Sequence, residues 1–304
     1  MSAQVAIITR TRNRSGLLRR ALASVVAQSF TDWRLYLVND AGDVASVDAA
    51  VSAAIPRAKV ELIHLAQQVG MEAATNLALK RASERFVVLL DDDDTWSPDF
   101  LSTAVKAIQQ PSSPGVRGVV TRSVVVEERL EDGSPVELAR KPFNGDLEAL
   151  SLERLSRGNQ FTNNAFLFER EALTSVGSYC EALPVYGDWD FNLRFLQAFE
   201  VDVVPLALAN YHRRVAGTGE QLNSFAQDPA IAARARAHLT NLWLRGQDGR
   251  SAQLGTLIAL GPFLEEQAAL RERVDKYLNA FHRLRRLPLL RSLDGALFGK
   301  RRKD

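Results

Sequence analysis

The stretch that decides the fold is Phe86-Val87-Val88-Leu89-Leu90-Asp91-Asp92-Asp93-Asp94, an apolar run joined directly to four acids. A segment that is hydrophobic at every position is typical of a strand buried on both faces of a parallel sheet. Ligands bind at the edge where parallel strands end. Adjacent carboxylates repel one another, and their oxygens are preferred ligands of hard divalent cations. We therefore interpret the four acids as a metal site at that edge.

A simpler interpretation of the same acids is a solvated turn that caps the next helix. Ser97-Pro98-Asp99 is a good helix start, and either Asp94 or Ser97 alone would serve as its cap. Four consecutive acids exceed what one cap needs. The metal interpretation is therefore favoured over the cap.

Apolar strands alternate with helical segments on both sides of this stretch. In the first half we expect strands at 5–9, 34–38, 60–64 and 86–90, and helices at 15–28, 44–54, 70–83 and 98–109. In the second half we expect strands at 116–128, 161–168 and 201–208, helices at 169–176 and 188–199, and mostly helix from about residue 225. This alternation predicts an α/β fold with a Rossmann-like, mostly parallel central sheet flanked by helices and a C-terminal helical extension.

Length and composition fit one large α/β domain with an appendage. The chain has 304 residues, of which 46% are hydrophobic and 24% charged, as in ordinary soluble globular proteins. A single cysteine, Cys180, excludes an intramolecular disulfide. No secretory signal pattern is seen, and the longest apolar candidate, 254–264, is too short for a bilayer span and is broken by Gly261-Pro262. We expect a cytoplasmic protein.

Several well-known functional signatures are missing from the sequence. It has no Gly-x-Gly-x-x-Gly fingerprint after the first strand, no Walker A loop, no His-Glu-x-x-His or Cys-x-x-Cys pair and no Gly-x-Ser-x-Gly elbow. Dinucleotide enzymes, P-loop enzymes, zinc proteases and α/β-hydrolases are therefore not indicated. A nucleotide still has a place to bind, because the loops at strand ends of a parallel sheet can hold one without these fingerprints.

Four blocks together carry a family resemblance. They are Ile7-Ile8-Thr9-Arg10-Thr11-Arg12-Asn13-Arg14, Leu35-Tyr36-Leu37-Val38-Asn39-Asp40, Leu89-Leu90-Asp91-Asp92-Asp93-Asp94-Thr95-Trp96 and Gly187-Asp188-Trp189-Asp190-Phe191-Asn192-Leu193-Arg194. In order and spacing the chain resembles the family 2 glycosyltransferases of the GT-A fold over roughly residues 3 to 215. The resemblance implies an inverting, metal-dependent transferase of the hexosyltransferase type.

The resemblance also implies a nucleotide-binding loop after the first strand. Thr11, Asn13 and Arg14 match the family there, whereas Arg10 and Arg12 replace the commoner proline and tyrosine. Two extra cations near a diphosphate are electrostatically reasonable, and we assign Arg12 to the nucleotide together with Thr11, Asn13 and Arg14.

Two further segments are assigned to the nucleotide. Asp40 matches the family's nucleotide-binding aspartate, although without the other blocks it would also fit a side-chain-closed turn. Gly70 and Asn76 are the first and last residues of a second such segment, in which Thr75 stands where the family usually has an arginine. A helix N-terminus there suits a phosphate, and Arg10 or Arg12 is our candidate to replace the missing guanidinium.

The four acids match the family's Asp-x-Asp motif. Asp93 is the first candidate as a ligand of Mn²⁺ or Mg²⁺, with Asp91 as a second ligand. Asp91 and Asp92 are also assigned to the nucleotide. The cation would neutralise charge on the leaving diphosphate. His212 is a candidate third ligand through its neutral imidazole, and a purely structural histidine is the alternative.

Asp188 is the predicted general base. It matches the family's acidic block, in which Gly187 replaces the usual glutamate. A carboxylate there would take the proton from the acceptor hydroxyl as it attacks the sugar. The alternative for Asp188 is a helix cap, a role that we assign instead to Asp190. For the acceptor we predict contacts with Asn163, Asn164 and Trp189, and the alternative for the two asparagines is hydrogen bonding at a strand edge.

These assignments divide the chain and define its substrates. We expect a catalytic domain at 1–222, with a nucleotide-binding half at 1–115 and an acceptor-binding half at 116–222, and a helical extension at 223–304. The donor would be a nucleotide diphosphate sugar, UDP-linked first and dTDP- or GDP-linked as alternatives. The acceptor would be a glycan or lipid-linked glycan in bacterial surface polysaccharide synthesis. A nucleotidyltransferase and an inactive nucleotide- or glycan-binding module are the competing functions.

The C-terminal extension leaves three interpretations open. From Arg271 to Asp304 there are eleven Lys/Arg against four Asp/Glu, and apolar residues recur every three or four positions from Leu264. The segment would pack on the catalytic domain, pair in a homodimer, or lie on anionic lipid at the inner face of the cell membrane. No groove-reading motif accompanies the charge, so nucleic acid is not an expected partner. We expect Gly217–Glu220 to be a loop that orders over the donor.

Overall fold

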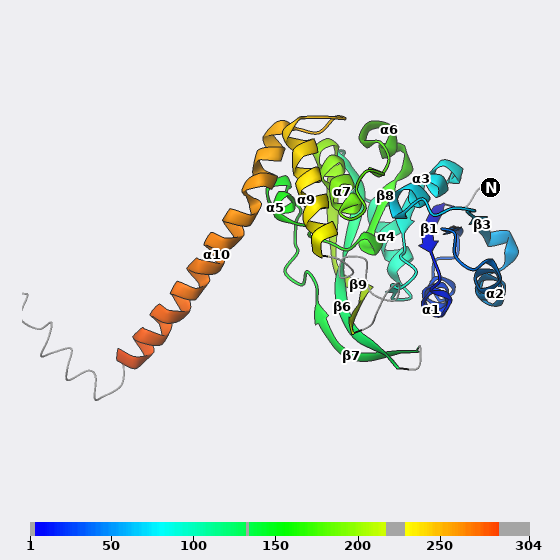
Figure 1. Cartoon of the computed structure of the whole chain (residues 1–304), viewed down its shortest axis with the longest axis horizontal. Helices are drawn as coiled ribbons and strands as arrows, with labels where there is room; N and C mark the ends of the chain where they lie inside the picture. Colours follow the sequence, from blue (N-terminus) through cyan, green and yellow to red (C-terminus); the bar gives the residue numbers. More distant parts are fainter. Residues whose placement is uncertain (1–3, 132–133, 217–228, 286–304) are drawn as a thin grey trace, which may run out of the picture.

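The computed structural model describes residues 4–131, 134–216 and 229–285. Helices lie on both faces of one mixed sheet (Figure 1), in which the strand order is β3-β2-β1-β4-β8-β6-β9-β5 and β7 pairs with β6. The expected Gly217–Glu220 loop, the domain boundary after residue 222 and the basic end of the chain lie outside the described residues. Fold class is as the sequence predicts: α/β, with helices at the C-terminal side.

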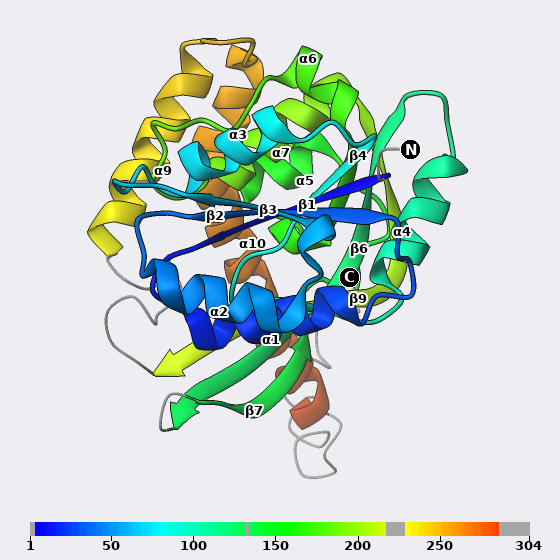
Figure 2. The same cartoon turned by 90° about the vertical axis from the view of Figure 1, so that its right-hand side faces the viewer.

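The first half of the chain forms βα units. Its elements are β1 (Val5–Thr11), α1 (Ser15–Val26), β2 (Trp33–Asn39), α2 (Val44–Ala54), the short helix η1 (Arg57–Lys59), β3 (Val60–His64), α3 (Met71–Arg81), β4 (Phe86–Leu89), β5 (Thr95–Trp96) and α4 (Phe100–Gln109). Helices α1 and α2 cover one face of the β3-β2-β1 end and α3 lies on the other (Figure 2). The predicted βα alternation is confirmed, and the fourth helix begins two residues later than expected, at Phe100, with Asp99 as its N-cap residue.

Parallel pairing brings the strand ends together. Thr11 of β1 is opposite Asn39 of β2, and Ile8 of β1 is opposite Leu89 of β4. Every residue of β4 is buried, as its apolar sequence predicts. The loops that follow β1, β2 and β4 therefore meet at one edge of the sheet, which is where the predicted nucleotide and metal residues lie.

The second half is largely antiparallel. It contains β6 (Val116–Glu131), β7 (Ser134–Pro142), α5 (Leu152–Arg157), η2 (Asn163–Ala165), β8 (Phe166–Glu169), η3 (Arg170–Ala172), α6 (Leu173–Val176), α7 (Gly187–Ala198) and β9 (Glu200–Ala216). Strand β8 pairs antiparallel with β4 and β6, and β9 runs parallel to β6.

Two predicted strand boundaries in this half were wrong. The expected strand 161–168 begins only at Phe166, because Asn163–Ala165 form a short helical turn. That turn is stabilised by hydrogen bonds to other strands. Trp96 Nε1 of β5 donates to the Asn164 carbonyl at 2.7 Å, and Asn164 Nδ2 donates to the Asn210 carbonyl of β9 at 3.1 Å. The strand expected at 201–208 continues to Ala216, since its polar second half still pairs with β6.

The C-terminal segment begins by packing on the catalytic body. Helix α9 (Pro229–Leu244) buries Leu239 and Trp243, and the start of α10 (Ala252–Arg285) buries Leu254 and Ile258. The Trp243 indole donates to Asp190 of α7 at 3.0 Å. The described part of the extension therefore joins the main core through α9 and the first turns of α10.

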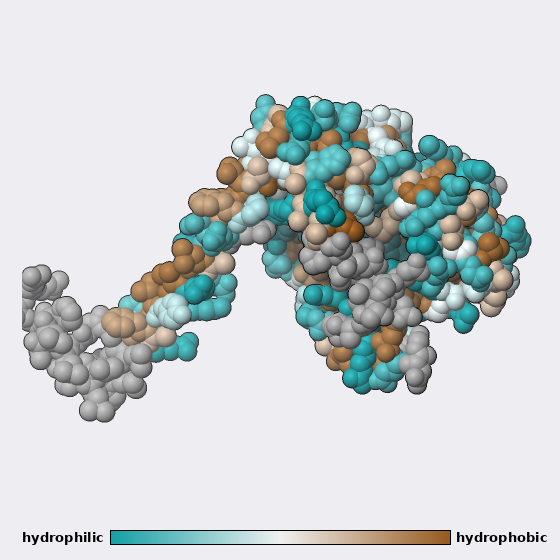
Figure 3. All heavy atoms as spheres, viewed as in Figure 1, coloured by the Kyte–Doolittle hydropathy of each residue, from teal (hydrophilic) through white to brown (hydrophobic). Residues whose placement is uncertain are grey.

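The rest of α10 projects away from the body (Figure 1). Apolar side chains remain exposed along it, among them Leu270 (51%), Tyr277 (70%) and Phe281 (55%) (Figure 3). Of the helices within the described ranges, none combines the length and apolar character needed to cross a bilayer.

Candidate active site

Arg10 spans the gap between two elements at the site edge. Its Nη2 lies 3.0 Å from Asp91 Oδ1, and its Nη1 donates to Thr75 Oγ1 at 3.1 Å. The guanidinium of Arg10, one of our two candidates, therefore lies against the position where the family usually has an arginine. Burial lowers the pKa of Arg10, but Asp91 and Glu72 outweigh it, so the pKa is raised and the group stays charged.

Asp92 is tied to the loop after β1. Its Oδ2 accepts from Thr11 Oγ1 at 2.7 Å, and its Oδ1 lies 3.3 Å from Arg14 Nη1. Burial raises the pKa of Asp92 to about 7, against the opposing effect of Arg14, and Asp93 adds to the rise. Thr11, Arg14 and Asp92 thus form one contact between the predicted nucleotide loop and the acidic stretch, with Arg12 half-buried on the same loop.

Asp93 lies between two arginines from distant parts of the chain. Its Oδ2 is 3.3 Å from Arg14 Nη1 and is hydrogen-bonded to Arg214 Nη2 of β9. The next acid, Asp94, is 2% exposed and accepts from the His212 backbone N–H at 2.9 Å. Burial raises the pKa of Asp94 well above its usual value, and Asp93 and Asp91 act in the same direction. The stretch thus brings several carboxyl groups close together, and a bound cation would reduce the repulsion between their charged forms.

His212 is engaged by neighbouring side chains. Its Nδ1 lies 2.9 Å from Glu128 Oε2, and its Nε2 lies 2.9 Å from Thr95 Oγ1. Glu128 also binds Arg20 Nη1 at 2.6 Å and lies 3.6 Å from Arg214 Nη1. Both ring nitrogens of His212 therefore have partners in this arrangement, which makes it part of a buried polar network behind Asp93. Ligation through its ring would first require one of these bonds to break.

Asp40 organises the entry to α3. Its two carboxylate oxygens accept from the backbone N–H groups of Val69 at 2.7 Å and Gly70 at 3.0 Å. The turn that follows β2 is closed by Asn39 instead, whose Oδ1 accepts from Gly42 N at 2.9 Å. Asn13 has a left-handed backbone (φ 54°) and accepts from Asp43 N at 3.0 Å. Asp40, Gly70 and Asn13 therefore all shape loops at the predicted nucleotide edge.

Asn76 faces a different part of the molecule. Its amide donates to the Tyr179 carbonyl at 2.9 Å and to Glu181 Oε1 at 2.8 Å, and its Oδ1 accepts from Tyr179 N at 3.0 Å. These three bonds fasten α3 to the loop that precedes α7. The structure thus gives Asn76 a fold-fixing contact and leaves it no bond toward the strand-end loops.

Asp188 is held by an amide relay at the start of α7. Its Oδ2 accepts from Asn159 Nδ2 at 2.7 Å, and Asn159 Oδ1 in turn accepts from Asn192 Nδ2 at 2.9 Å. The preceding Tyr186 has a left-handed backbone (φ 69°), a strained conformation that clusters at functional sites. The relay fixes the carboxylate, and among the residues that the structure describes no cationic side chain forms an ion pair with it.

Asp188 and the four acids lie in the same electrostatic environment. Burial raises the pKa of Asp188, the Trp189 backbone N–H opposes the rise, and Asp91 reinforces it. Arg10, which is paired with Asp91, also acts on Asp188. The predicted base and the acidic stretch are therefore near enough to influence each other's pKa, and Arg10 acts on both.

The three predicted acceptor residues differ in how far they are exposed. Trp189 is 1% exposed, and its indole donates to the Leu155 carbonyl at 2.7 Å, so its ring is part of the core. Asn164 is fully buried, with its backbone and amide used by Trp96 and Asn210. Asn163 is half-buried in the turn before β8. Only Asn163 of the three presents part of its surface to a ligand.

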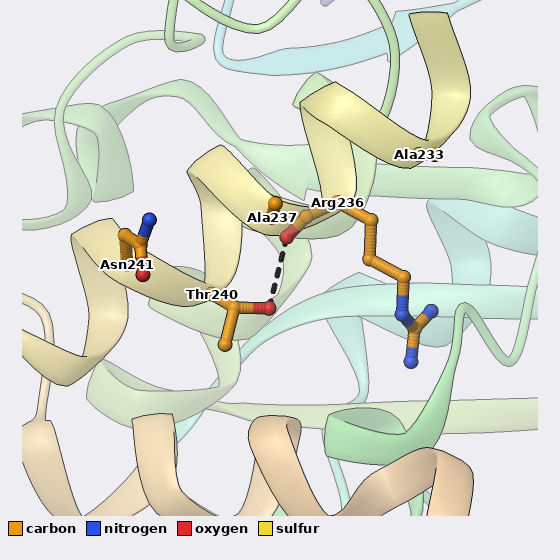
Figure 4. Close-up of a pocket in the computed structure, with 5 residues that line it drawn as sticks. All are labelled: Ala233, Arg236, Ala237, Thr240 and Asn241. Atoms are coloured by element: carbon orange, nitrogen blue, oxygen red, sulfur yellow. Dashed lines mark hydrogen bonds between the residues drawn. The ribbon is translucent and has the colours of Figure 1, made fainter. Parts of the chain in front are cut away.

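A shallow pocket of about 450 Å³ on α9 adjoins this region. It is lined by Ala233, Arg236, Ala237, Thr240 and Asn241 (Figure 4). The Arg236 guanidinium lies over the Trp189 ring at 5.0 Å, and the same side chain is hydrogen-bonded to Tyr186. Arg236 therefore links α9 to the segment that positions Asp188.

The acids fit a metal that arrives with its substrate. Within the described part of the chain, no three His, Cys, Asp or Glu side chains converge so as to hold an ion alone. Mg²⁺ and Mn²⁺ are commonly held by one or two carboxylates together with substrate phosphates. The side chains of Asp91 and Asp93 are 31% and 9% exposed, so they can offer those one or two ligands.

Several residues of the site escaped sequence reasoning. Asn159 and Asn192 form the relay behind Asp188, Glu128 and Arg20 support the acidic stretch, and Glu72 lies against Gly187. The acidic pair Glu127-Glu128 inside the strand Val116–Glu131 was the available signal for Glu128. The asparagines carry no comparable signal, because amides are common on any surface.

Comparison with known proteins settles the family. Residues 6–171, more than half of the chain, match the model for glycosyl transferase family 2. The chain belongs to this family. It is an enzyme of the glycosyltransferase class, as the four sequence blocks predict.

Two curated relatives come from bacteria. An uncharacterized glycosyltransferase, YwdF of Bacillus subtilis, is 27% identical over 71% of this chain and 77% of its own length. The succinoglycan biosynthesis protein ExoO of Rhizobium meliloti is 31% identical over 45% of this chain and 39% of its own. The family therefore has members in bacterial polysaccharide biosynthesis that resemble this glycosyltransferase.

Solved structures share the fold. TarS of S. aureus in complex with UDP-GlcNAc aligns with a TM-score of 0.59 at 17% identity, over 84% of this chain and 70% of that one. The mannosyltransferase PcManGT of Pyrobaculum calidifontis, in complex with GDP-Man and Mn²⁺, aligns with a TM-score of 0.59 at 17% identity, over 96% and 83%. These likenesses confirm the GT-A architecture.

Proposed function

We propose that this glycosyltransferase is an inverting enzyme that moves a sugar from a nucleotide diphosphate sugar to a hydroxyl of a glycan or lipid-linked glycan. The observation that carries the proposal is the common electrostatic environment of Asp188 and Asp91, both of which are acted on by Arg10. An inverting transfer needs a base on one side of the sugar and charge stabilisation on the other. The site supplies a carboxylate for the first task, and cations with metal-ligating acids for the second.

In this proposal Asp188 takes the acceptor proton. Its raised pKa makes it a stronger base than an ordinary aspartate, and Asn159 holds its Oδ2 so that the carboxylate keeps one orientation. Burial is the largest cause of the rise, and the residue is half-buried, so a face of it stays open to an acceptor. The acceptor hydroxyl would then lose its proton as it attacks the sugar carbon from the α7 side.

The opposite side of the sugar would belong to the diphosphate. Arg10 and Arg14 stand beside Asp91 and Asp93 and can pair with phosphate oxygens. Mn²⁺ or Mg²⁺ held by Asp93 and Asp91 would neutralise charge on the departing diphosphate. Thr11, Asn13, Asp40 and Gly70 would shape the pocket of the nucleoside and ribose through the loops that they fix.

Solved relatives favour a nucleotide sugar without deciding which one. TarS is seen with a UDP-sugar and PcManGT with a GDP-sugar and Mn²⁺. A UDP-sugar remains our first candidate, with GDP- and dTDP-sugars next. The polysaccharide role of relatives such as ExoO supports a surface glycan acceptor. We place the enzyme in the cytoplasm. For the exposed apolar face of α10, peripheral contact with the membrane and pairing in a homodimer remain the alternatives.

A nucleotide-sugar panel tests this function. UDP-, GDP- and dTDP-sugars are incubated with Mn²⁺ or Mg²⁺ and a mixture of glycan acceptors, and release of the nucleoside diphosphate is measured. We expect release with one nucleotide class, and its loss when EDTA removes the metal. Release of pyrophosphate would instead indicate a nucleotidyltransferase. Binding of UDP and metal without turnover would indicate an inactive module.

A further inference from the structure

Glu72 occupies space that a side chain at position 187 would need. It lies in the first turn of α3 and is 6% exposed. A Cβ placed on Gly187 would come within 2.3 Å of Glu72 Oε1 and 2.4 Å of its Cδ. Only a glycine at position 187 therefore leaves room for this carboxyl, which lies against the residue that precedes Asp188.

The Glu72 carboxyl has no fixed partner in the described structure. Across residues 4–131, 134–216 and 229–285, no hydrogen bond or ion pair is made by this side chain. A buried carboxyl without partners is costly, so such groups are uncommon unless a ligand completes them. The charged and titratable groups that act on it are Arg10 of β1, Asp91 after β4, Asp188 and Asp190 of α7, and Tyr179 in the loop before α7.

These neighbours determine its protonation. Burial raises the pKa of Glu72 to about 8, Arg10 opposes the rise, and Asp188 and Asp91 reinforce it. At neutral pH the group therefore carries a proton and is a hydrogen-bond donor as well as an acceptor. A carboxylic acid that can both donate and accept suits a sugar hydroxyl better than it suits a phosphate.

We propose that Glu72 binds a hydroxyl of the transferred sugar and thereby positions the donor between Arg10 and Asp188. This proposal rests on the glycosyltransferase function proposed above. The position follows from the order of the groups: Arg10 is on the diphosphate side, Asp188 on the acceptor side, and Glu72 faces both from α3. Gly187 is its structural partner, because any larger residue there would displace the carboxyl.

The test compares removal, replacement and relocation of the carboxyl. The variants are Glu72→Ala, Glu72→Gln and the double variant Glu72→Ala/Gly187→Glu, with Glu171→Ala at an exposed helix position as the matched control. Calorimetry measures affinity for the free nucleoside diphosphate with Mn²⁺ and for the nucleotide sugar. Kinetics measure kcat and KM for the same donor.

We expect Glu72→Ala to lower kcat/KM for the sugar donor by about 10- to 100-fold, the range of a hydrogen bond to a substrate hydroxyl. Affinity for the free nucleoside diphosphate should stay within about twofold, because the diphosphate contacts other groups. The double variant should recover at least part of the loss by returning a carboxyl to the same space. An equal loss for the nucleotide with and without its sugar would overturn the proposal, as would unchanged kinetics.

The pH dependence supplies a second readout. Wild-type kcat/KM should fall as pH rises through about 8, where Glu72 loses its proton, and Glu72→Gln should remove that limb because glutamine keeps a donor. A limb that persists in Glu72→Gln would reject the assignment.

Stability separates this proposal from the proposed function. The pKa of Glu72 is higher in the folded state than in the unfolded state. Its contribution to stability is therefore fully present below about pH 4.5 and is lost as pH rises through about 8. Glu72→Gln should therefore raise Tm relative to wild type at pH 9 and leave it nearly unchanged at pH 4. A wild type that turns over no donor would reject the glycosyltransferase function even if this shift appears. An active wild type with indifferent Glu72 variants would reject the Glu72 proposal alone.

Discussion

Asp188 and Asp190 lie two residues apart on helix α7, but their surroundings differ. Asp190 is fully buried and compensated: Arg194 Nε lies 3.0 Å from it, Arg250 binds both of its oxygens at 2.8 and 2.9 Å, and the Trp243 indole donates at 3.0 Å. Asp188 accepts from one asparagine and one backbone N–H. Its carboxyl neighbours are Asp91 and Glu72, and Arg10 is the nearby cation.

The difference separates a structural carboxylate from a chemical one. Asp190 is paired with two arginines and accepts from the Trp243 indole, so the group fastens α9 and the loop that precedes α10 to α7. Around Asp188 the acids outnumber the cations, and their pKa values rise. Perturbed pKa values of this kind cluster where a protein must bind or transfer protons. A divalent cation bound there would lower these pKa values and reduce the repulsion between the carboxyl groups.

The largest expected effect is on catalysis. Asp188→Asn keeps the size and the Asn159 contact of this side chain but removes the base, so transfer should fall by about 10²- to 10⁴-fold. Donor affinity, measured by calorimetry with Mn²⁺, should stay nearly constant. If transfer survives in this variant, Asp188 is not the base. The contrast between a structural Asp190 and a catalytic Asp188 would then be wrong.

Asp190→Ala should instead damage the fold. It leaves Arg194 and Arg250 buried without their carboxylate, and breaking a buried pair from one side costs about 3–5 kcal/mol. Urea unfolding of the variant should show this loss. As a control, Asp190→Leu combined with Arg250→Met removes the carboxylate and one of its two arginines, and should cost less than the single change because only Arg194 then lacks its carboxylate. Equal losses would mean that Asp190 contributes by packing alone.

Glu128 offers a test of opposite sign to Glu72. Burial tends to raise its pKa, but His212 and Arg20 overcome this and lower it to about 2. Its stabilising contribution is therefore present above the ordinary pKa of about 4.5 and is lost as pH falls toward 2, with an upper size of about 3 kcal/mol. Unfolding followed from pH 5 to pH 2 should be steeper for wild type than for Glu128→Gln. Parallel curves would contradict compensation at this carboxylate.

The smallest expected effect is at the far end of α10. Phe281 is 55% exposed, so Phe281→Glu should change the free energy of unfolding by no more than about 0.5 kcal/mol. Leu239→Ala on the packed helix α9, where Leu239 is fully buried, is the matched contrast at about 2–5 kcal/mol. Sedimentation then tests whether α10 forms a homodimer, and flotation with anionic vesicles tests whether it binds a membrane. Loss of a dimer or of vesicle binding in Phe281→Glu would identify what covers this face.

The periodic part of the fold was readable from the sequence. The apolar run 86–90, the spacing of the βα units and the helix 188–199 each follow from local pattern, and the structure places them within a few residues of expectation. Prediction weakened where polar residues continued a strand, as in β9 to Ala216, or interrupted one, as in Asn163–Ala165. There the outcome depended on partners from other elements.

The same division holds within the site. The sequence by itself determined that acids follow β4 and that an aspartate begins α7, because local patterns of hydrophobicity and charge are written in consecutive residues. Only the tertiary structure decided that Arg10 meets Thr75, that Asn159 holds Asp188, and that Glu72 fills the space beside Gly187. Those pairs lie far apart in the chain, and their meeting depends on how helices pack against a twisted sheet, which no local pattern records.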